Sequence, residues 1–144
     1  MEDILRKRNQ RNNELTLPFG NAKYAPVTAE DQGNVIAAIL SAPEAHAGQT
    51  YPLFGREELT QYDVANILSD VLGLKITYKP MEITEFVNYL TDKRSNYHIH
   101  HVAAVAQDCR DGLFSGTNNL IEEITGQRPM GMPDFLYKNK ALFE

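Results

Sequence analysis

Residues 60–80, TQYDVANILSDVLGLKITYKP, contain the strongest local pattern in the chain. Apolar side chains recur at helical spacing over residues 64–72 and form one continuous stripe. Thr60 can cap the start of that helix, and Gly73 can supply the left-handed residue that ends it. Apolar and polar residues then alternate over 74–79, which predicts a strand. A helix that leads directly into a strand is typical of α/β folds.

The same two periodicities organise the rest of the chain. Residues 15–19 and 23–27 are predicted to be extended and to pair as a hairpin, because Gly20 and Asn21 between them favour a turn. A further strand is predicted over 49–54. A helical stub is predicted in the first dozen residues, and further helices are predicted from Thr28 to Pro43 and around 84–90. The next predicted helix has an inward stripe formed by His98, Val102, Val105 and Cys109. Two more helices are predicted, one capped by Thr117 or Asn118 and one that starts at Pro133.

Composition limits the classes of function. At 144 residues the chain can form one domain with a sizeable core. Its formal net charge is −5, which argues against nucleic acid as a partner because phosphate binding needs a concentrated positive field. The basic cluster Arg6, Lys7, Arg8 and Arg11 is interpreted as a solvated helix end.

Targeting signals are absent from the sequence pattern. Cys109 is the single cysteine and cannot form an internal disulfide, which favours a reducing compartment. No apolar run approaches the roughly 18 residues of a membrane span. The acidic start at Met1 has no apolar signal core. We therefore expect no membrane association and a cytoplasmic location.

Dinucleotide binding needs a Gly-rich turn between a strand and a helix, where backbone N–H groups can approach a pyrophosphate. The nine glycines of this chain never form that pattern. No cofactor-binding residue is therefore predicted within these 144 residues.

Several residues could carry chemistry, and each also has a simpler explanation. Tyr89 and Lys93 match the Tyr-x-x-x-Lys spacing of a proton-donating pair, but they lie on a short helix and are interpreted as a chance match. Cys109 lies on an apolar stripe and is interpreted as a buried, unreactive thiol. Asp31 is either a capping acid or an acid in a cleft. No catalytic residue is assigned.

The only dense histidine cluster is His98, His100 and His101. His98 and His101 could share a face, with Asp108 further along the helix, but a metal site needs a third well-placed ligand and supporting groups. We predict no metal site. Two interpretations remain open: the histidines bond to the backbone near a helix start, or His101 lies in a substrate cleft.

Five segments in order resemble the NmrA-like family, which is related to atypical short-chain dehydrogenases/reductases. The segments are Tyr24–Asp31, Ala45–Tyr51, Ala103–Asp108 with Gly112–Thr117, Ile124–Pro129, and Asp134–Leu136 with Ala141–Phe143. The resemblance implies an α/β fold that forms the C-terminal part of a Rossmann-like NAD(P)-binding protein, with few strands and about five to six helices. Residues 1–144 would then be a single C-terminal, substrate-side region. Met1–Leu5 is similar to an internal segment of the family, so the N-terminal dinucleotide-binding half is expected to be absent from these residues.

The resemblance also implies a site and a function. Phe19, Tyr24, Pro26 and His101 are the implied substrate-binding residues, although the segment over 19–26 could equally be a hairpin that packs an edge. The implied function is that of a fragment or short paralogue of an NAD(P)H-dependent oxidoreductase, quinone-reductase-like, that would be inactive alone. Whether the chain is an enzyme stays open. The alternative is a non-catalytic, dinucleotide-sensing regulatory or protein-binding module, so the implied partners are a small-molecule substrate or a protein.

A strand separated from a larger sheet leaves an open edge and an uncovered face. We therefore predict an exposed apolar patch beside the strand that contains Tyr51 and Leu53. The same open edge predicts homodimer formation.

Overall fold

The computed structural model describes residues 13–91 and 93–143. Strands β1 (Glu14–Leu17) and β2 (Thr77–Pro80) form a parallel two-stranded sheet. The helices of the described part are α2 (Ala29–Ser41), α3 (Pro43–His46), α4 (Gln61–Leu72), α5 (Ile83–Leu90), α6 (Asn96–Arg110), α7 (Leu120–Thr125), α8 (Met132–Lys138) and the short 3-10 helix η1 (Lys140–Leu142). This part of the chain is α/β, as the sequence predicts. The predicted helical stub lies outside the described residues.

Helix α4 has the boundaries that the sequence predicts. The hydroxyl of Thr60 accepts a hydrogen bond from Asp63 N at 3.2 Å, and the Asp63 carboxylate accepts one from Thr60 N at 2.8 Å. Gly73 ends the helix with φ 65°, a conformation that a residue without a Cβ adopts freely. The predicted apolar stripe, which includes Val64 and Leu68, is buried and faces β2 and α8. Local sequence signals and tertiary packing therefore agree in this helix.

A side-chain bridge fixes where strand β2 begins. Ser69 near the end of α4 accepts a hydrogen bond from Ile76 N at 2.9 Å through its Oγ atom. Among the described residues, the pairing with β1 starts at Thr77, whose N–H donates to Asn13 O at 3.1 Å. The strand predicted over 74–79 is present, but its ladder is shorter and shifted toward the carboxyl end.

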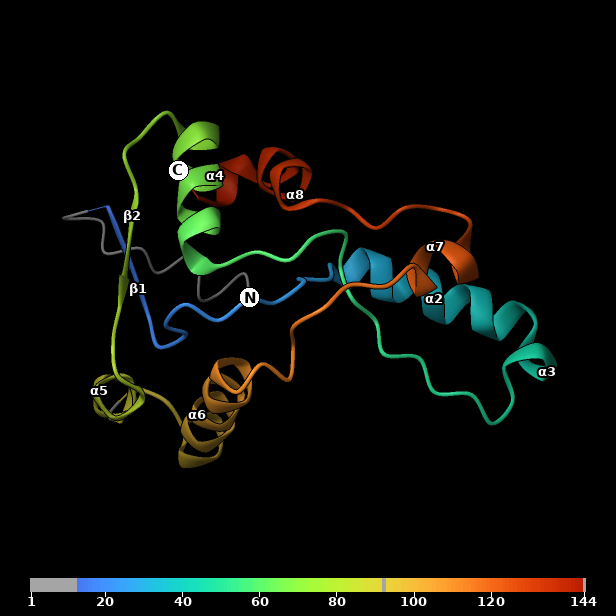
Figure 1. Cartoon of the computed structure of the whole chain (residues 1–144), viewed down its shortest axis with the longest axis horizontal. Helices are drawn as coiled ribbons and strands as arrows, with labels where there is room; N and C mark the ends of the chain where they lie inside the picture. Colours follow the sequence, from blue (N-terminus) through green and yellow to red (C-terminus); the bar gives the residue numbers. More distant parts are fainter. Residues whose placement is uncertain (1–12, 92, 144) are drawn as a thin grey trace.

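The elements fall into two groups (Figure 1), which we call the main lobe and the α2 lobe. The main lobe contains β1, β2, α4, α5, α6 and α8, and the α2 lobe contains α2, α3 and α7. The continuous hydrophobic core lies in the main lobe. Val35 of α2 and Ile121 of α7 are buried but lie outside that core.

The hairpin predicted over residues 15–27 is wrong. After β1 the chain turns, with Ala22 N donating to Phe19 O at 3.1 Å, and does not return along β1. Tyr24 instead forms an isolated antiparallel bridge with Leu59, through hydrogen bonds of 3.1 and 2.9 Å. β1 is already paired in parallel with β2, which lies about 60 residues away and cannot be inferred from local turn signals.

The strand predicted over residues 49–54 is also wrong, because this segment has no strand assignment and pairs with neither strand of residues 13–91 and 93–143. Pro52 has no N–H to donate, and its carbonyl accepts from the side chain of Asn118 at 2.7 Å. Leu53 is half-buried, and the large exposed apolar side chains among the described residues lie on other segments. The segment itself therefore carries no large exposed apolar side chain, and an apolar patch beside it stays a prediction.

The inward face of α6 differs from the predicted one. Ile99, Ala106 and Cys109 are buried, whereas His98 is exposed and Val105 is only half-buried. Together with the half-buried Val102, which packs against the core, the buried residues follow spacings of three and four and form one helical face that only partly overlaps the expected one. Cys109 is common to both faces, which explains why the burial of its thiol is predicted correctly.

Two further helix ends depart slightly from the sequence pattern. Helix α7 begins at Leu120 after Asn119, and Asn118 Oδ1 accepts from Leu120 N at 3.2 Å. The last predicted helix is divided into α8 and η1. None of the described helices has the length and apolar character needed to cross a bilayer.

Candidate functional site

The carboxyl ends of β1 and β2 lie at one edge of the sheet, because the two strands are parallel. In open α/β sheets, ligands bind outside this edge. The chain leaves β1 through Pro18 and Phe19, and it leaves β2 through Met81 and Glu82. We take this edge and the side chains around it as the candidate site.

Arg110, the last residue of α6, joins the two strand ends. Its Nε donates to Pro18 O at 2.8 Å, one terminal nitrogen donates to Met81 O at 2.9 Å, and the other pairs with the Glu82 carboxylate at 3.1 Å. The rigid guanidinium thus satisfies backbone carbonyls from both strand exits at once. Sequence reasoning missed this residue. The available signal was a basic side chain in the last turn of a helix, which indicates an interaction with carbonyls but does not say which ones.

A buried polar pair lies between the bridge segment and α4. Tyr24 is 8% exposed, and its hydroxyl accepts a hydrogen bond from Gln61 Nε2 at 3.0 Å. Gln61 is 2% exposed, and its Oε1 atom has no hydrogen-bond partner among the described residues. Burial raises the pKa of Tyr24 well above that of a free phenol, and the nearby Cys109 and Tyr78 act in the same direction. The Tyr24 hydroxyl is therefore neutral at physiological pH.

Tyr78 of β2 also contacts this edge, because its hydroxyl bonds to the last residue of β1. Its hydroxyl donates to Leu17 O at 3.0 Å, and its ring meets that of Tyr62 edge-to-face with centroids 4.8 Å apart. Burial is the main reason that the pKa of Tyr78 rises to about 12. Both tyrosines near the candidate site therefore act as neutral hydrogen-bonding groups.

An apolar loop follows Arg110 directly. Leu113 and Phe114 are 62% and 40% exposed, and they lie between Gly112 and Gly116, which have φ 81° and 101°. Gly116 N donates to the carboxylate of Glu58, which ties the loop to the segment before α4. The loop therefore starts directly after the residue that bonds both strand exits, and it exposes two apolar side chains.

The structure places the four predicted substrate-binding residues in different environments. Phe19 is half-buried against the main core, to which the buried Tyr24 also belongs. Pro26 is half-buried further toward α2, and its carbonyl oxygen approaches Gly55 so closely that a Cβ there would lie 1.9 Å away. His101 is exposed on α6. Two of the four thus share one core, and the substrate role of all four stays a prediction.

The other chemical candidates have structural explanations. Lys93 Nζ lies 3.4 Å from the centroid of the Tyr89 ring, so this pair forms a surface cation–π contact. Burial raises the pKa of Cys109 and disfavours its reactive thiolate. His98 and His101 are exposed, and the described ranges contain no group of three or more ligating side chains that could hold a metal ion.

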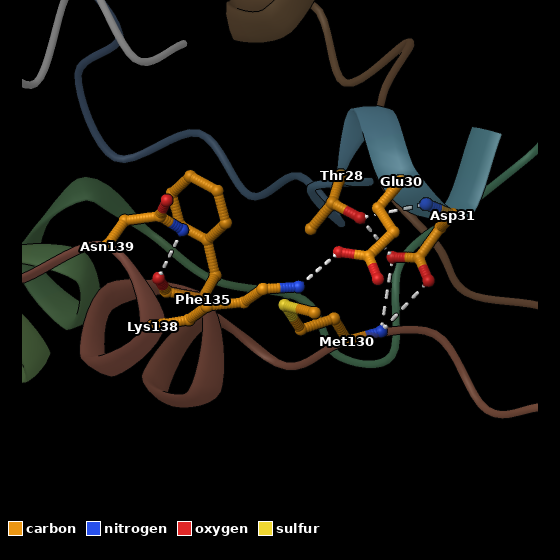
Figure 2. Close-up of polar contacts among 7 residues, drawn as sticks. All are labelled: Thr28, Glu30, Asp31, Met130, Phe135, Lys138 and Asn139. Carbon is orange, nitrogen blue, oxygen red and sulfur yellow. Dashed lines mark hydrogen bonds and ion pairs between the residues drawn. The ribbon is translucent and has the colours of Figure 1, made fainter. Parts of the chain in front are cut away.

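Asp31 lies in the first turn of α2, which Thr28 caps, and its carboxylate joins the two lobes (Figure 2). Its backbone N–H donates to the Thr28 hydroxyl at 3.0 Å, and its carboxylate accepts from that hydroxyl at 2.6 Å. The same carboxylate accepts from Met130 N at 3.1 Å. Figure 2 also shows Lys138 of α8 paired with Glu30 of α2. Of the two interpretations of Asp31, the structure supports the capping one.

Comparisons with known proteins place this fold. No family model matches the chain. It is 27% identical over 124 residues to festuclavine dehydrogenase easG of Aspergillus fumigatus, a match that covers 85% of this chain and 43% of that protein. The chain spans about half the length of the curated relatives it matches, between 43% and 50%.

Two solved structures are similar over nearly the whole chain. Triphenylmethane reductase of Citrobacter sp., complexed with NADP(H), has a TM-score of 0.80 and 22% identity over 94% of this chain and 46% of that one. The NADPH-dependent quinone oxidoreductase of Escherichia coli has a TM-score of 0.84 and 18% identity over 99% of this chain and 52% of that one. At such identities the likeness shows the fold. The chain has the α/β fold of the C-terminal part of a Rossmann-like NAD(P)-binding protein, as the sequence predicts.

Proposed function

We propose that these 144 residues form the substrate-side half of an NmrA-like, NAD(P)H-dependent oxidoreductase that acts on an apolar ring compound such as a quinone. The observation that carries the proposal is the agreement in fold, over 99% of this chain, with about half of an NADPH-dependent quinone oxidoreductase. A reductase complexed with NADP(H) and a curated dehydrogenase match nearly the same extent of the chain.

The proposed substrate site is the edge where β1 and β2 end. Phe19 and Tyr24 would contact the substrate from the core side, and Leu113 and Phe114 would cover its apolar face. Behind these residues, the buried pair of Tyr24 and Gln61 would close the core side of the site. Such a surface suits a flat ring with a few polar substituents. Pro26 and His101 are proposed as further substrate contacts at its margins.

The cofactor would be held by other residues. A dinucleotide's pyrophosphate binds where a helix N-terminus presents free N–H groups. Here the first turn of α2 carries Glu30 and Asp31, and the start of α4 is occupied by the Asp63 carboxylate. These negative groups fill and oppose the position that a phosphate would need. The starts of α2 and α4 therefore do not fit a pyrophosphate, and we assign the described residues no step that involves the cofactor.

Two probes test the proposal on the chain alone, 2-methyl-1,4-naphthoquinone and NADPH. We expect the quinone to raise the melting temperature, because a ligand at one hundred times its dissociation constant adds about 2.7 kcal/mol of apparent stability. Phe114→Ser should weaken quinone binding, and Tyr97→Ser, at an exposed position on α6, should not. NADPH should produce no shift. Stabilisation by NADPH but not by the quinone would contradict the proposal.

The alternative of a non-catalytic sensing module gains no support from the described residues or from the relatives.

A further inference from the structure

The loop between α6 and α7 exposes two apolar side chains at its tip. Leu113 and Phe114 are 62% and 40% exposed, and the glycines at positions 112 and 116 have φ 81° and 101°. Residues with a Cβ rarely adopt such angles, so the path of the loop depends on these two glycines. We call residues 112–116 the apolar loop.

Hydrogen bonds within the apolar loop and to the end of α6 hold it in one shape. Leu113 N donates to Asp108 O at 3.0 Å. Ser115 donates twice to Gly112 O, from its backbone N–H at 3.1 Å and from its hydroxyl at 2.6 Å. These bonds leave the loop little freedom of its own, so its orientation is set by the points at which its two ends are attached.

The two ends of the apolar loop are attached to different parts of the molecule. Arg110, just before the loop, bonds the carbonyls of Pro18 and Met81 at the ends of β1 and β2. At the other end, Gly116 N donates to the carboxylate of Glu58, 58 residues earlier in the chain. A hydrogen bond to an ionised carboxylate is stronger than one between neutral groups. Glu58 therefore fixes the exit of the loop.

Glu58 lies on a second connection between the two lobes. The chain passes from the α2 lobe to the main lobe between α3 and α4, and it passes back between α6 and α7 (Figure 1). Another hydrogen bond joins the same two connections, from Asn118 Nδ2 to Pro52 O at 2.7 Å. The exit of the apolar loop is thus held by the segment before α4, which is remote in sequence.

The attachment at Arg110 limits how far the apolar loop lies from the candidate site. Phe114 follows Arg110 by four residues, and a chain extends by at most about 3.5 Å per residue, so their Cα atoms lie within about 14 Å of each other. Arg110 itself bonds the carbonyls at the carboxyl edge of the sheet. The direction of the loop therefore decides whether Phe114 contacts a ring bound at this edge.

We propose that Glu58 is a positioning residue, which holds Gly116 N and so keeps the apolar loop in the orientation in which Phe114 packs on the face of a quinoid ring. This inference rests on the proposed function and extends it to a side chain that does not itself touch the substrate. Glu58 is exposed, so its bond contributes little to stability and chiefly fixes a direction. Stacking of two rings depends on their relative orientation, so a rotation of the loop weakens binding.

The test measures quinone binding and loop attachment in one set of variants. The probe is 2-methyl-1,4-naphthoquinone, titrated into the 144-residue protein and followed by NMR. Glu58→Ala should weaken binding at least fivefold, speed hydrogen exchange of the Gly116 amide and leave the melting temperature unchanged. Glu58→Gln keeps an acceptor oxygen and should restore most of the affinity. Glu57→Ala, at the neighbouring exposed carboxylate, is the matched control and should change neither quantity.

A double-mutant cycle separates positioning from a direct contact. If Glu58 acts through Phe114, Glu58→Ala should have no further effect on quinone binding in a chain that already carries Phe114→Ser. Losses that add in the double variant would overturn the inference, and so would an unchanged exchange rate of the Gly116 amide in Glu58→Ala.

The failure of this inference can be told from that of the proposed function. Quinone binding by the unmodified chain that Glu58→Ala leaves intact would overturn this inference alone. No quinone binding by the unmodified chain would contradict the proposed function and the role of Glu58 together.

Discussion

Arg110 shows how one side chain can define a site. It bonds the carbonyl that follows β1 and the carbonyl that follows β2, so the spacing of the two strand exits depends on it. The side chain is 26% exposed, which leaves these charge-assisted hydrogen bonds partly shielded from water. The ion pair with Glu82 contributes little to the free energy of unfolding, because that carboxylate is 76% exposed.

Replacing Arg110 should therefore cost more than breaking its ion pair. We expect Arg110→Leu to lower the free energy of unfolding by about 1–3 kcal/mol, since two carbonyls lose their donors. Glu82→Gln, the matched control, should change it by less than about 0.5 kcal/mol. Urea denaturation of both variants measures the difference. Equal effects would show that Arg110 acts only through the exposed ion pair.

The buried tyrosines predict an alkaline limit to stability. In the unfolded chain tyrosine ionises near pH 10, whereas in the folded chain the pKa of Tyr78 is about 12 and that of Tyr24 is raised further. A raised pKa in the folded state means that stability is fully present below pH 10 and declines as the pH rises above it. For Tyr24 the decline should approach about 1.4 kcal/mol per pH unit.

Unfolding measured in urea between pH 8 and pH 11 tests this sign. Tyr24→Phe should flatten the decline, and Tyr97→Phe, at a residue that is 84% exposed on α6, should leave it unchanged. A decline that is just as steep in Tyr24→Phe would contradict the assignment.

At the scale of elements, local signals account for α4 and for the start of α2, and they fail where pairing is long-range. The caps at Thr60 and Thr28 could be read from sequence because capping needs only residues three apart. The parallel pairing of β1 with β2 could not, since two extended segments joined by a Gly–Asn turn favour a hairpin on local grounds. The same limit explains why Tyr24 was found as a candidate but its partner Gln61 was not. Their contact spans 37 residues.

The two capping aspartates should differ in their effect on stability. Asp63 caps α4 at an exposed position, so Asp63→Ala should cost about 1 kcal/mol. Asp31→Ala keeps the hydrogen bond from the backbone N–H of residue 31 to Thr28, but it leaves the Thr28 hydroxyl and Met130 N without their carboxylate acceptor, so it should cost about 2–3 kcal/mol. Thermal denaturation of the two variants compares them. If Asp31→Ala proves no worse than Asp63→Ala, the contact with Met130 contributes nothing.

The Asp63 cap also gives an acid dependence. Hydrogen bonds from Thr60 lower the pKa of Asp63 below its usual value. Its contribution is therefore present near neutral pH and is lost as the pH falls below about 4. The difference in stability between the original chain and Asp63→Ala should shrink over that range.

At the scale of the whole molecule, the two lobes should differ in local stability. The main lobe contains the continuous core, whereas α2 and α7 lie outside it. Backbone amides around Leu68 of α4 should exchange with solvent only on global unfolding, and those around Ile36 of α2 should exchange much faster. Native-state hydrogen exchange compares them directly. Equal protection would mean that the α2 lobe is stabilised as strongly as the main lobe.

The proposal that this chain is a substrate-side half is tested most directly by a residue-resolved NMR titration of the 144-residue protein, first with NADPH and then with 2-methyl-1,4-naphthoquinone. We expect the quinone to shift the amide signals of Phe19, Tyr24, Leu113 and Phe114, and we expect NADPH to shift none in a saturable way. Saturable binding of NADPH by the chain alone, or quinone shifts confined to residues remote from the ends of β1 and β2, would contradict the account.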